Sequence, residues 1–361
     1  MPFQLRALRS AALAAVVACP TVAAMAQTQF APLVPFTSLS QLDPDMANVV
    51  KSYDSFRGTP IIDLTPQDAR RQISIQDTTK LIARYTGDQL APTPVGKVYD
   101  QVSFVGIDGH QVPARIYKPA GAPPASGYYP VVLYFHGGGF VIATIDTYDE
   151  SARILANRSN ALVVSVEYRK GPEHPFPLAL RDADTSYRWV VDNIGIYDGN
   201  PNKIALAGEA AGGNLAAEEA IHVRNSSMPK PVYQLLIYPE TTTNLDQQSD
   251  KLYTSPLLPL NTAALPWFSK YYNPDHVTNQ EVQPVNADLR GLPPATIIAA
   301  QFDPLVSDGQ VYATKLAAAG VKVDYQLYTG VTHEFFGLGA EVAKARSAEA
   351  HAGSVLAAAF R

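Results

Sequence analysis

The sequence predicts an α/β protein in which about eight mostly parallel strands form one sheet flanked by helices. Short, continuous apolar runs recur along the chain, and such runs are typical of parallel strands that are covered on both faces. Segments of helical character separate these runs, as in βαβ units. The 361 residues, 47% of them hydrophobic, supply enough material for one large domain of this class.

The charge balance limits the partners that the chain can have. Lys and Arg total 28 against 33 Asp and Glu, which gives a formal net charge of −5. A protein that binds nucleic acid needs a basic face, so this mild acidity argues against nucleic acid as a partner.

Residues 1–26 have the features of a secretory signal peptide. Two arginines precede an apolar core at 11–18, and a small-residue cleavage motif ends at Ala26. That core is too short to span a membrane, and no later stretch qualifies. We therefore expect an exported protein, periplasmic or secreted. Cleavage removes Cys19, the only cysteine, and leaves no disulfide or thiol nucleophile; a lipoprotein modified at Cys19 is the alternative.

Residues 27–97 precede the first clear strand and are irregular and rich in proline. Helical patches lie at about 45–55 and 65–85, and Thr65 followed by proline is a typical helix start. We expect this segment to cover the main domain as part of a cap; a mobile N-terminus is the alternative.

Residues 98–361 are expected to form the main domain. Segments 98–105 and 111–117 alternate between apolar and polar residues across a short turn, which predicts an antiparallel hairpin. The continuous runs predict the remaining strands at 131–135, 162–166, 204–207, 235–238, 295–299 and 321–328. The segments between and after them predict helices at 148–157, 178–193, 214–224, 309–319 and 340–360. An aromatic-rich stretch at 241–290 interrupts the alternation and is expected to be a second part of the cap or a pocket wall.

A glycine-framed turn joins the strand predicted at 204–207 to the helix that follows it. Gly208 and Gly212 bound this turn, with Glu209 and Ala210 between them. Strand, tight turn and helix form the arrangement that presents the serine nucleophile in G-x-S-x-G enzymes, and neighbours of the strained apex must be nearly free of side chains. The apex residue here is Ala210, and no hydroxyl or thiol lies within the turn.

A second glycine-rich loop, His136-Gly137-Gly138-Gly139, directly follows the strand predicted at 131–135. A glycine run leaves backbone N–H groups uncovered, and such groups can stabilise the oxyanion of an acyl-transfer intermediate. A lone run of glycines is more often an ordinary loop. The position ahead of the glycine-framed turn favours the oxyanion interpretation.

Asp303 and His333 follow the last two predicted strands, so the chain order is turn, acid, histidine, as in α/β hydrolases. His333 would act as general base and then general acid. Asp303 would hold its tautomer and stabilise the imidazolium. Asp308 is a competing acid, ranked below Asp303 because its position indicates the start of the next helix.

Together these motifs resemble those of the hormone-sensitive-lipase-like carboxylesterases, the bacterial family IV of esterases. The resemblance runs from about residue 98 to 337, and several independent segments match in the right order. These segments are 136–140, 168–169, 172–177, 208–214, 289–294, 303–305 and 333–335.

The resemblance implies an α/β-hydrolase fold and hydrolysis of carboxylic esters through an acyl-enzyme. A small-molecule ester of short-to-medium acyl length would be the partner, with no metal or organic cofactor. The oxyanion donors would be the N–H groups of Gly138, Gly139 and Ala211, while His136 and His174 would stabilise loops.

The chain departs from this family at Ala210, where the family has its serine. One interpretation is a deliberate Ser→Ala change in an esterase, which would leave the chain inactive or nearly so. The other is a natural, non-catalytic relative that binds esters or related carbonyl ligands, which the retained signal sequence favours. We favour the first, because relaxed selection should also erode Asp303 and His333, and both remain.

Overall fold

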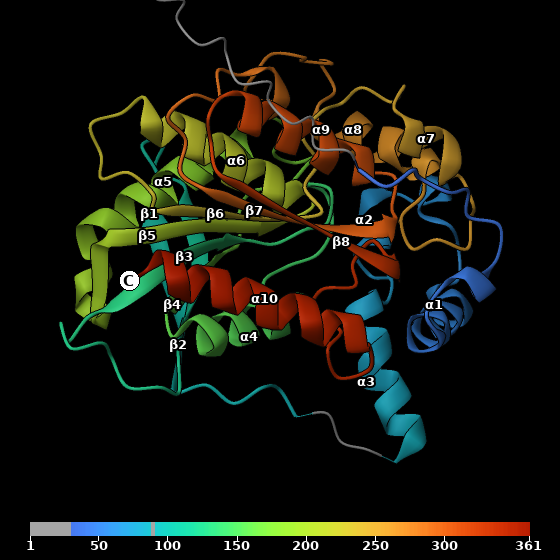
Figure 1. The fold of residues 1–361 in the computed structure, drawn as a ribbon, viewed down its shortest axis with the longest axis horizontal. Coiled ribbons are helices and arrows are strands. Elements are labelled where there is room, and N and C mark those ends of the chain that lie inside the picture. Colours follow the sequence, from blue (N-terminus) through green and yellow to red (C-terminus); the bar gives the residue numbers. More distant parts are fainter. Residues whose placement is uncertain (1–29, 88–90) are drawn as a thin grey trace, which may run out of the picture.

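The computed structural model describes residues 30–87 and 91–361, so the predicted signal peptide lies outside the described residues. One eight-stranded sheet with helices on both faces forms the body of the molecule, which confirms the predicted fold class (Figure 1). The strands are β1 (Lys97–Val105), β2 (Gln111–Lys118), β3 (Tyr129–Phe135), β4 (Leu162–Val166), β5 (Gly199–Glu209), β6 (Tyr233–Ile237), β7 (Ala295–Phe302) and β8 (Val323–Thr332).

The sheet has the strand order β1-β2-β4-β3-β5-β6-β7-β8. The hairpin β1–β2 is antiparallel, as predicted, and β2 also pairs antiparallel with β4. All other neighbours are parallel. The carboxyl ends of β3 to β8 therefore meet at one edge of the sheet, where ligand sites of open α/β sheets form.

Helices cover both faces of the sheet. The α-helices are α1 (Pro44–Arg57), α2 (Pro66–Ala69), α3 (Ile75–Thr86), α4 (Asp149–Ser159), α5 (Leu178–Asn193), α6 (Ala211–Arg224), α7 (Gln248–Leu252), α8 (Leu265–Tyr272), α9 (Val306–Ala318) and α10 (Ala343–Ala359). Short 3₁₀ helices are η1 (Leu39–Gln41), η2 (Ile61–Asp63), η3 (Ile194–Tyr197), η4 (Thr262–Ala264) and η5 (Pro284–Asn286). Figure 1 shows α4 and α10 on one face, and α5, α6 and α9 on the other.

The continuous apolar runs arise because each central strand contributes to two cores. In β3, Val131, Leu133 and Phe135 belong to the core that includes residues of α5 and α6. Val132 and Tyr134 point the other way, into the core that includes residues of α4 and α10. Successive side chains of a strand alternate between the two faces, so a strand covered on both faces needs apolar residues at every position.

Helix α6 begins at Ala211, three residues before the predicted start at 214. The prediction was wrong here because Gly212 and Gly213 suggested a loop. They lie in the first turn of the helix, where the backbone passes so close to its neighbours that a Cβ on Gly212 would lie 2.0 Å from the carbonyl oxygen of Phe135. These glycines serve close packing and not chain flexibility.

The N-terminal segment and the 241–290 stretch contact each other. Thr65 caps α2, since its hydroxyl accepts a hydrogen bond from the Asp68 N–H at 3.2 Å. The indole N–H of Trp267 on α8 donates to the carbonyl oxygen of Leu64 at 3.0 Å. Both segments therefore lie over the same part of the molecule.

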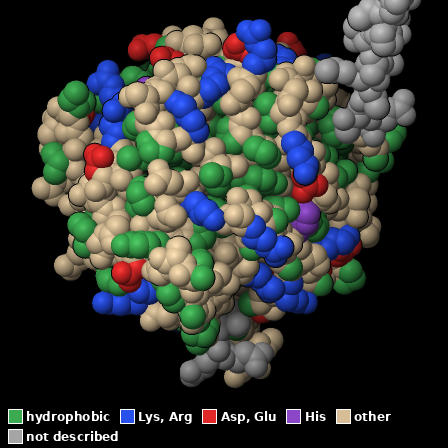
Figure 2. Space-filling model, turned by 60° about the vertical axis from the view of Figure 1, so that its left-hand side comes forward, with side chains coloured by type: hydrophobic (Ala, Val, Ile, Leu, Met, Phe, Trp, Pro, Cys, Tyr) green, Lys and Arg blue, Asp and Glu red, His purple; other side chains and the backbone are tan. Residues whose placement is uncertain are grey.

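The surface charges and the lengths of the helices complete the description of the fold. Figure 2 shows Lys and Arg side chains dispersed over one face among apolar and neutral ones, with acidic side chains between them. Within residues 30–87 and 91–361, no helix combines the length and the apolar character needed to cross a membrane.

Candidate active site

Ala210 lies at the apex of the turn between β5 and α6 in a strained conformation. Its φ of 50° and ψ of −114° fall outside the regions that residues with a Cβ ordinarily adopt. Three hydrogen bonds hold it there: its N–H donates to the Ile237 carbonyl at 3.0 Å, and its carbonyl accepts from the N–H groups of Asn214 at 3.1 Å and Glu240 at 3.2 Å. The surrounding backbone therefore maintains the strain, as in a site built to present one side chain.

Gly208 and Gly212 frame this apex because no larger residue fits. A Cβ on Gly208 would lie 2.0 Å from the carbonyl oxygen of Gly212, and one on Gly212 would lie equally close to that of Phe135. Real Cβ atoms do not approach backbone oxygens so closely. The glycine frame thus has a steric cause.

Replacing Gly212 with alanine should therefore destabilise the fold. We expect the free energy of unfolding to fall by about 3 kcal/mol, at the upper end of the cost of overpacking. Gly195→Ala is the matched control, because a Cβ there meets no atom within 4 Å, and its effect should stay within about 1 kcal/mol. Urea titrations of both variants measure this, and equal stabilities would contradict the steric argument.

Three backbone N–H groups next to the apex make no hydrogen bond within the described residues. They belong to Gly138 and Gly139, which have positive φ values of 102° and 58°, and to Ala211, the first residue of α6. All three residues line the cavity that Ala210 also lines. A helix start carries a partial positive charge, so this end of the cavity suits a negative oxygen.

His136 contacts the glycine loop from the buried side. It is fully buried, its ring stacks on Tyr168 at 4.4 Å, and its Nδ1 lies 2.7 Å from the carbonyl oxygen of Gly137. Burial lowers the pKa of His136 to about 4, so the ring is neutral and donates its Nδ1 proton to that carbonyl. His174 lines the cavity with its ring 5.8 Å from that of His110.

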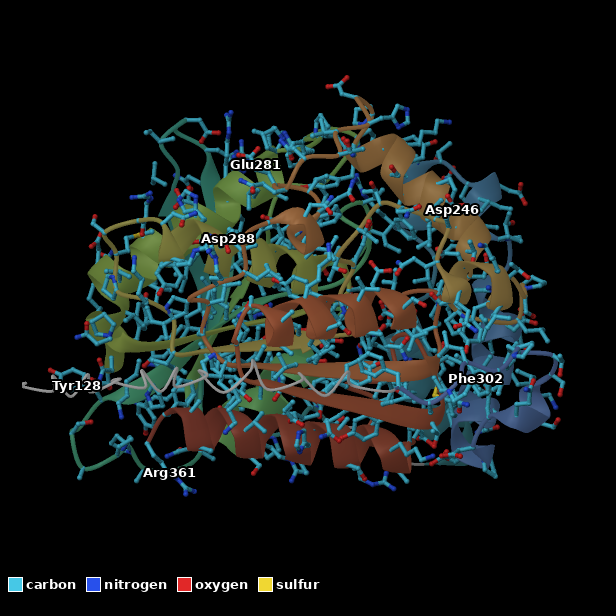
Figure 3. All side chains as sticks on the ribbon, turned by 45° about the horizontal axis from the view of Figure 1, so that its top comes forward. Tyr128, Asp246, Glu281, Asp288, Phe302 and Arg361 are labelled. Atoms are coloured by element: carbon cyan, nitrogen blue, oxygen red, sulfur yellow. The ribbon has the colours of Figure 1, made fainter. Side chains whose placement is uncertain are left out.

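The structure brings Asp303 and His333 together. Strand β7 ends at Phe302, which Figure 3 shows at one end of the sheet, and Asp303 follows directly; His333 follows the end of β8. The Oδ2 atom of Asp303 lies 2.7 Å from Nδ1 of His333, and its Oδ1 accepts the N–H of Leu305 at 2.8 Å. Asp308 lies elsewhere: its Oδ1 accepts the N–H groups of residues 241 and 242 at 2.8 and 3.0 Å.

Two opposing effects determine the charge state of His333. Burial, the larger single effect, lowers the pKa of its imidazole. The charge and hydrogen bond of Asp303, with smaller contributions from Glu334 and Glu209, raise this pKa, and the net result lies above the ordinary value of 6.5. The imidazolium is therefore stabilised, as required of a group that takes up a proton during a reaction.

Glu209, the residue before the apex, lies buried behind the cavity. Its fully buried carboxylate accepts hydrogen bonds from the hydroxyl of Tyr134, at 2.6 Å, and from that of Tyr238. Burial raises the pKa of Glu209 to about 7. The ring of Tyr238 lies 4.6 Å from that of His333, so Glu209 helps to position the histidine through this tyrosine.

The sequence patterns missed a set of polar residues around His333. The Oε1 atom of Glu334 accepts the Tyr148 hydroxyl at 2.6 Å and lies 3.9 Å from Nε2 of His333. Its Oε2 accepts the amide of Gln76 on α3 at 2.5 Å. No local pattern marks Gln76, because its role depends on a contact with a residue 258 positions away.

The sequence patterns did not identify Arg70 either. Its guanidinium donates to the carbonyl oxygens of Val141 at 2.7 Å and Gly171 at 2.6 Å, and it forms two hydrogen bonds with Glu173. These bonds tie the residue that follows α2 to the loop after the glycine run. The N-terminal segment therefore takes part in building the site.

These residues surround one cavity of about 790 Å³. Ala210, His333 and the three free N–H groups line it, while Asp303 lies behind His333. Volumes of this size are typical of small-molecule sites. In the part of the chain that the structure describes, no group of three or more His, Cys, Asp and Glu side chains is placed to hold a metal ion.

Known proteins are similar to this chain in sequence and in fold. The profile of a family described as alpha/beta hydrolase fold matches residues 132–337. Carboxylesterase NlhH of Mycobacterium tuberculosis is 40% identical over 237 residues, which are 64% of this chain and 73% of that protein.

Solved structures agree with these matches. A hyperthermophilic esterase from the archaeon Pyrobaculum calidifontis aligns with a TM-score of 0.78 and 33% identity, over 88% of this chain and 98% of that one. A serine-to-alanine mutant of LAE6, an alpha/beta hydrolase enzyme from the metagenome of Lake Arreo in Spain, aligns with a TM-score of 0.79 and 32% identity, over 89% and 99% of the two chains. The chain belongs to the carboxylesterase-type family of α/β hydrolases.

Proposed function

We propose that this chain is the scaffold of a carboxylic ester hydrolase that acts on short-to-medium acyl esters. Ala210 occupies the place of the nucleophilic serine, so the chain is inactive or nearly so. The observation that carries the proposal is one shared cavity: the strained apex, the His333–Asp303 pair and three unbonded N–H groups all belong to it or support it.

With serine at position 210, the arrangement performs acyl transfer. Nε2 of His333 takes the hydroxyl proton as the oxygen attacks the ester carbonyl, and the N–H groups of Gly138, Gly139 and Ala211 bind the oxyanion. His333 then gives this proton to the leaving alcohol, which leaves an acyl-enzyme. Water, activated by His333, attacks the acyl-enzyme and releases the acid. The methyl group of Ala210 prevents the first of these steps.

We further propose that Ala210 results from a Ser→Ala change in an active esterase. In support, the strained turn, the paired histidine and the free N–H groups all persist around it, although none of them is needed to fold a core. The natural binding protein without catalysis is the second candidate, and the codon and protein sequence of the source strain at position 210 discriminate between the two.

The cavity should limit the acyl chain of the substrate. The acyl chain must fit within about 790 Å³, and aromatic residues such as Phe268 form part of the cavity wall. We expect kcat/KM of the Ala210→Ser variant to be highest for acetate, butyrate or hexanoate and to fall for laurate and palmitate. Turnover of the p-nitrophenyl esters, at one fixed detergent concentration, measures this. A steady rise towards palmitate would contradict the prediction.

Export is a separate proposal that rests on residues 1–26 alone. We expect the signal peptide to be removed after Ala26, so that the exported protein begins at Gln27. Intact-mass spectrometry of the periplasmic and culture fractions measures the mature N-terminus. A chain that retains Met1, or one that carries lipid on Cys19, would contradict it.

A further inference from the structure

A second cavity, of about 420 Å³, adjoins the catalytic one. Its walls come from the segment after β6, from α8 and the loop that follows it, and from the start of α9. Glu240 and Leu265 line both cavities, so these two residues form the boundary between them. The second cavity therefore lies next to the catalytic cavity, with Glu240 between them.

Glu240 is fixed directly beside the reacting position. Its N–H donates to the carbonyl oxygen of Ala210 at 3.2 Å, and its own carbonyl accepts the side-chain amide of Asn214 on α6 at 3.0 Å. The backbone of Glu240 is thus held by the same turn that presents Ala210. Its side chain therefore starts from a fixed point next to position 210.

The carboxylate of Glu240 lacks a partner. Across the two described ranges, no donor forms a hydrogen bond or an ion pair with it, although the residue is half-buried. Burial raises the pKa of Glu240 to about 7, while the nearby His333 lowers it. The half-buried carboxylate is only partly withdrawn from water, so a ligand that supplies a positively charged donor can reach it and gain both a hydrogen bond and an ion pair.

The other acidic side chains of the second cavity already have hydrogen-bond partners. Asp308 and Asp250 already accept hydrogen bonds, from residues 241 and 242 and from the backbone of Gln247. Lys270 supplies a positive side chain, which is exposed at the outer part of the cavity. The inner end, beside position 210, is therefore the acidic end.

We propose that the second cavity receives the alcohol part of the ester and that Glu240 binds a protonated amine there, so that esters of amino alcohols are preferred substrates. The inference rests on the proposed ester hydrolysis. The alcohol side is assigned because His333 gives its proton to the leaving alcohol oxygen, and Glu240 is close enough for its charge to act on His333.

A matched pair of ligands tests this on the unmodified chain, which we expect to bind esters with little or no turnover. 2-(Dimethylamino)ethyl butyrate and 3-methylbutyl butyrate have nearly the same shape, but only the first carries a protonated amine at neutral pH. We expect the amine to bind at least about tenfold more tightly in isothermal titration calorimetry, as for a hydrogen bond between charged groups. Equal affinities would overturn the inference.

Variants locate the effect. Glu240→Gln keeps the size of the side chain and removes its charge, so the ratio of the two affinities should fall to near one. Asp246→Asn is the matched control: it removes an exposed acid close to the second cavity, labelled in Figure 3, and should keep the ratio. A ratio that survives Glu240→Gln would overturn the assignment to Glu240. The ligand pair tests the parent protein even if that variant does not fold.

The Ala210→Ser variant separates this inference from the proposed function. If it hydrolyses p-nitrophenyl butyrate but the two ligands bind equally, the amine site is wrong and ester hydrolysis stands. If it hydrolyses no ester but the preference for the amine depends on Glu240, the hydrolase proposal is wrong and the amine site stands.

Discussion

Replacing Ala210 with serine is expected to raise the hydrolysis of p-nitrophenyl butyrate by at least about 10³-fold. In subtilisin, removal of the nucleophilic serine lowers kcat by about 10⁶-fold, so a lower bound of 10³ allows for imperfect geometry in the restored site. The substitution adds one oxygen at an apex whose backbone is already held by three hydrogen bonds, so the fold should accept it. The variant and the unmodified chain, prepared side by side, provide the measurement.

The control must show that the position of the hydroxyl matters. Ala263→Ser places a hydroxyl in the same cavity but away from the turn, and it should leave the rate at that of the unmodified chain. A fluorophosphonate should label Ala210→Ser and neither of the other two proteins. A folded Ala210→Ser variant that remains as slow as the unmodified chain would contradict the hydrolase proposal. The binding-protein alternative would then be tested by ligand-induced shifts in melting temperature.

The fold could be predicted from the sequence because its signals are local. In β3, apolar residues at every position indicated a strand covered on both faces, and its two cores confirm that reason. The predicted start of α6 was wrong, because Gly212 suggested a loop although it lies in the first turn of the helix, where a Cβ would meet the carbonyl oxygen of Phe135.

Some residues of the candidate site could likewise be predicted from the sequence, and others could not. Ala210, Asp303 and His333 could be chosen because each follows a parallel strand, and the ends of these strands meet at one edge. Gln76 could not be chosen, because it reaches Glu334 only through the packing of the N-terminal segment over the sheet. Glu240 could have been chosen as a candidate site residue, because it is a charged residue two positions after the apolar run at 235–238.

Asp303→Asn, made in the Ala210→Ser background, should lower kcat by about 10³–10⁴-fold. The carboxylate now accepts the Nδ1 proton of His333 at 2.7 Å, which leaves Nε2 free to act as the base. An asparagine can present an N–H in its place and favour the wrong tautomer, as in the Asp→Asn variant of a serine protease, which loses about 10⁴-fold. Asp308→Asn is the matched comparison, because Asp308 bonds to the backbone of residues 241 and 242, and it should cost less than about tenfold.

A pH profile adds a readout that a purely structural role would not change. Ester hydrolysis needs neutral His333, so kcat/KM of the Ala210→Ser variant should rise as the pH rises through the pKa of this group. Asp303 raises that pKa and burial lowers it, so Asp303→Asn removes the main effect that raises the pKa while burial continues to lower it. The acidic limb of the profile should therefore move to lower pH. NMR titration of His333, with Ala210 kept, should show its pKa shift in the same direction when Asp303→Asn is introduced. A shift to higher pH, or an equal loss of rate in Asp308→Asn, would contradict the role assigned to Asp303.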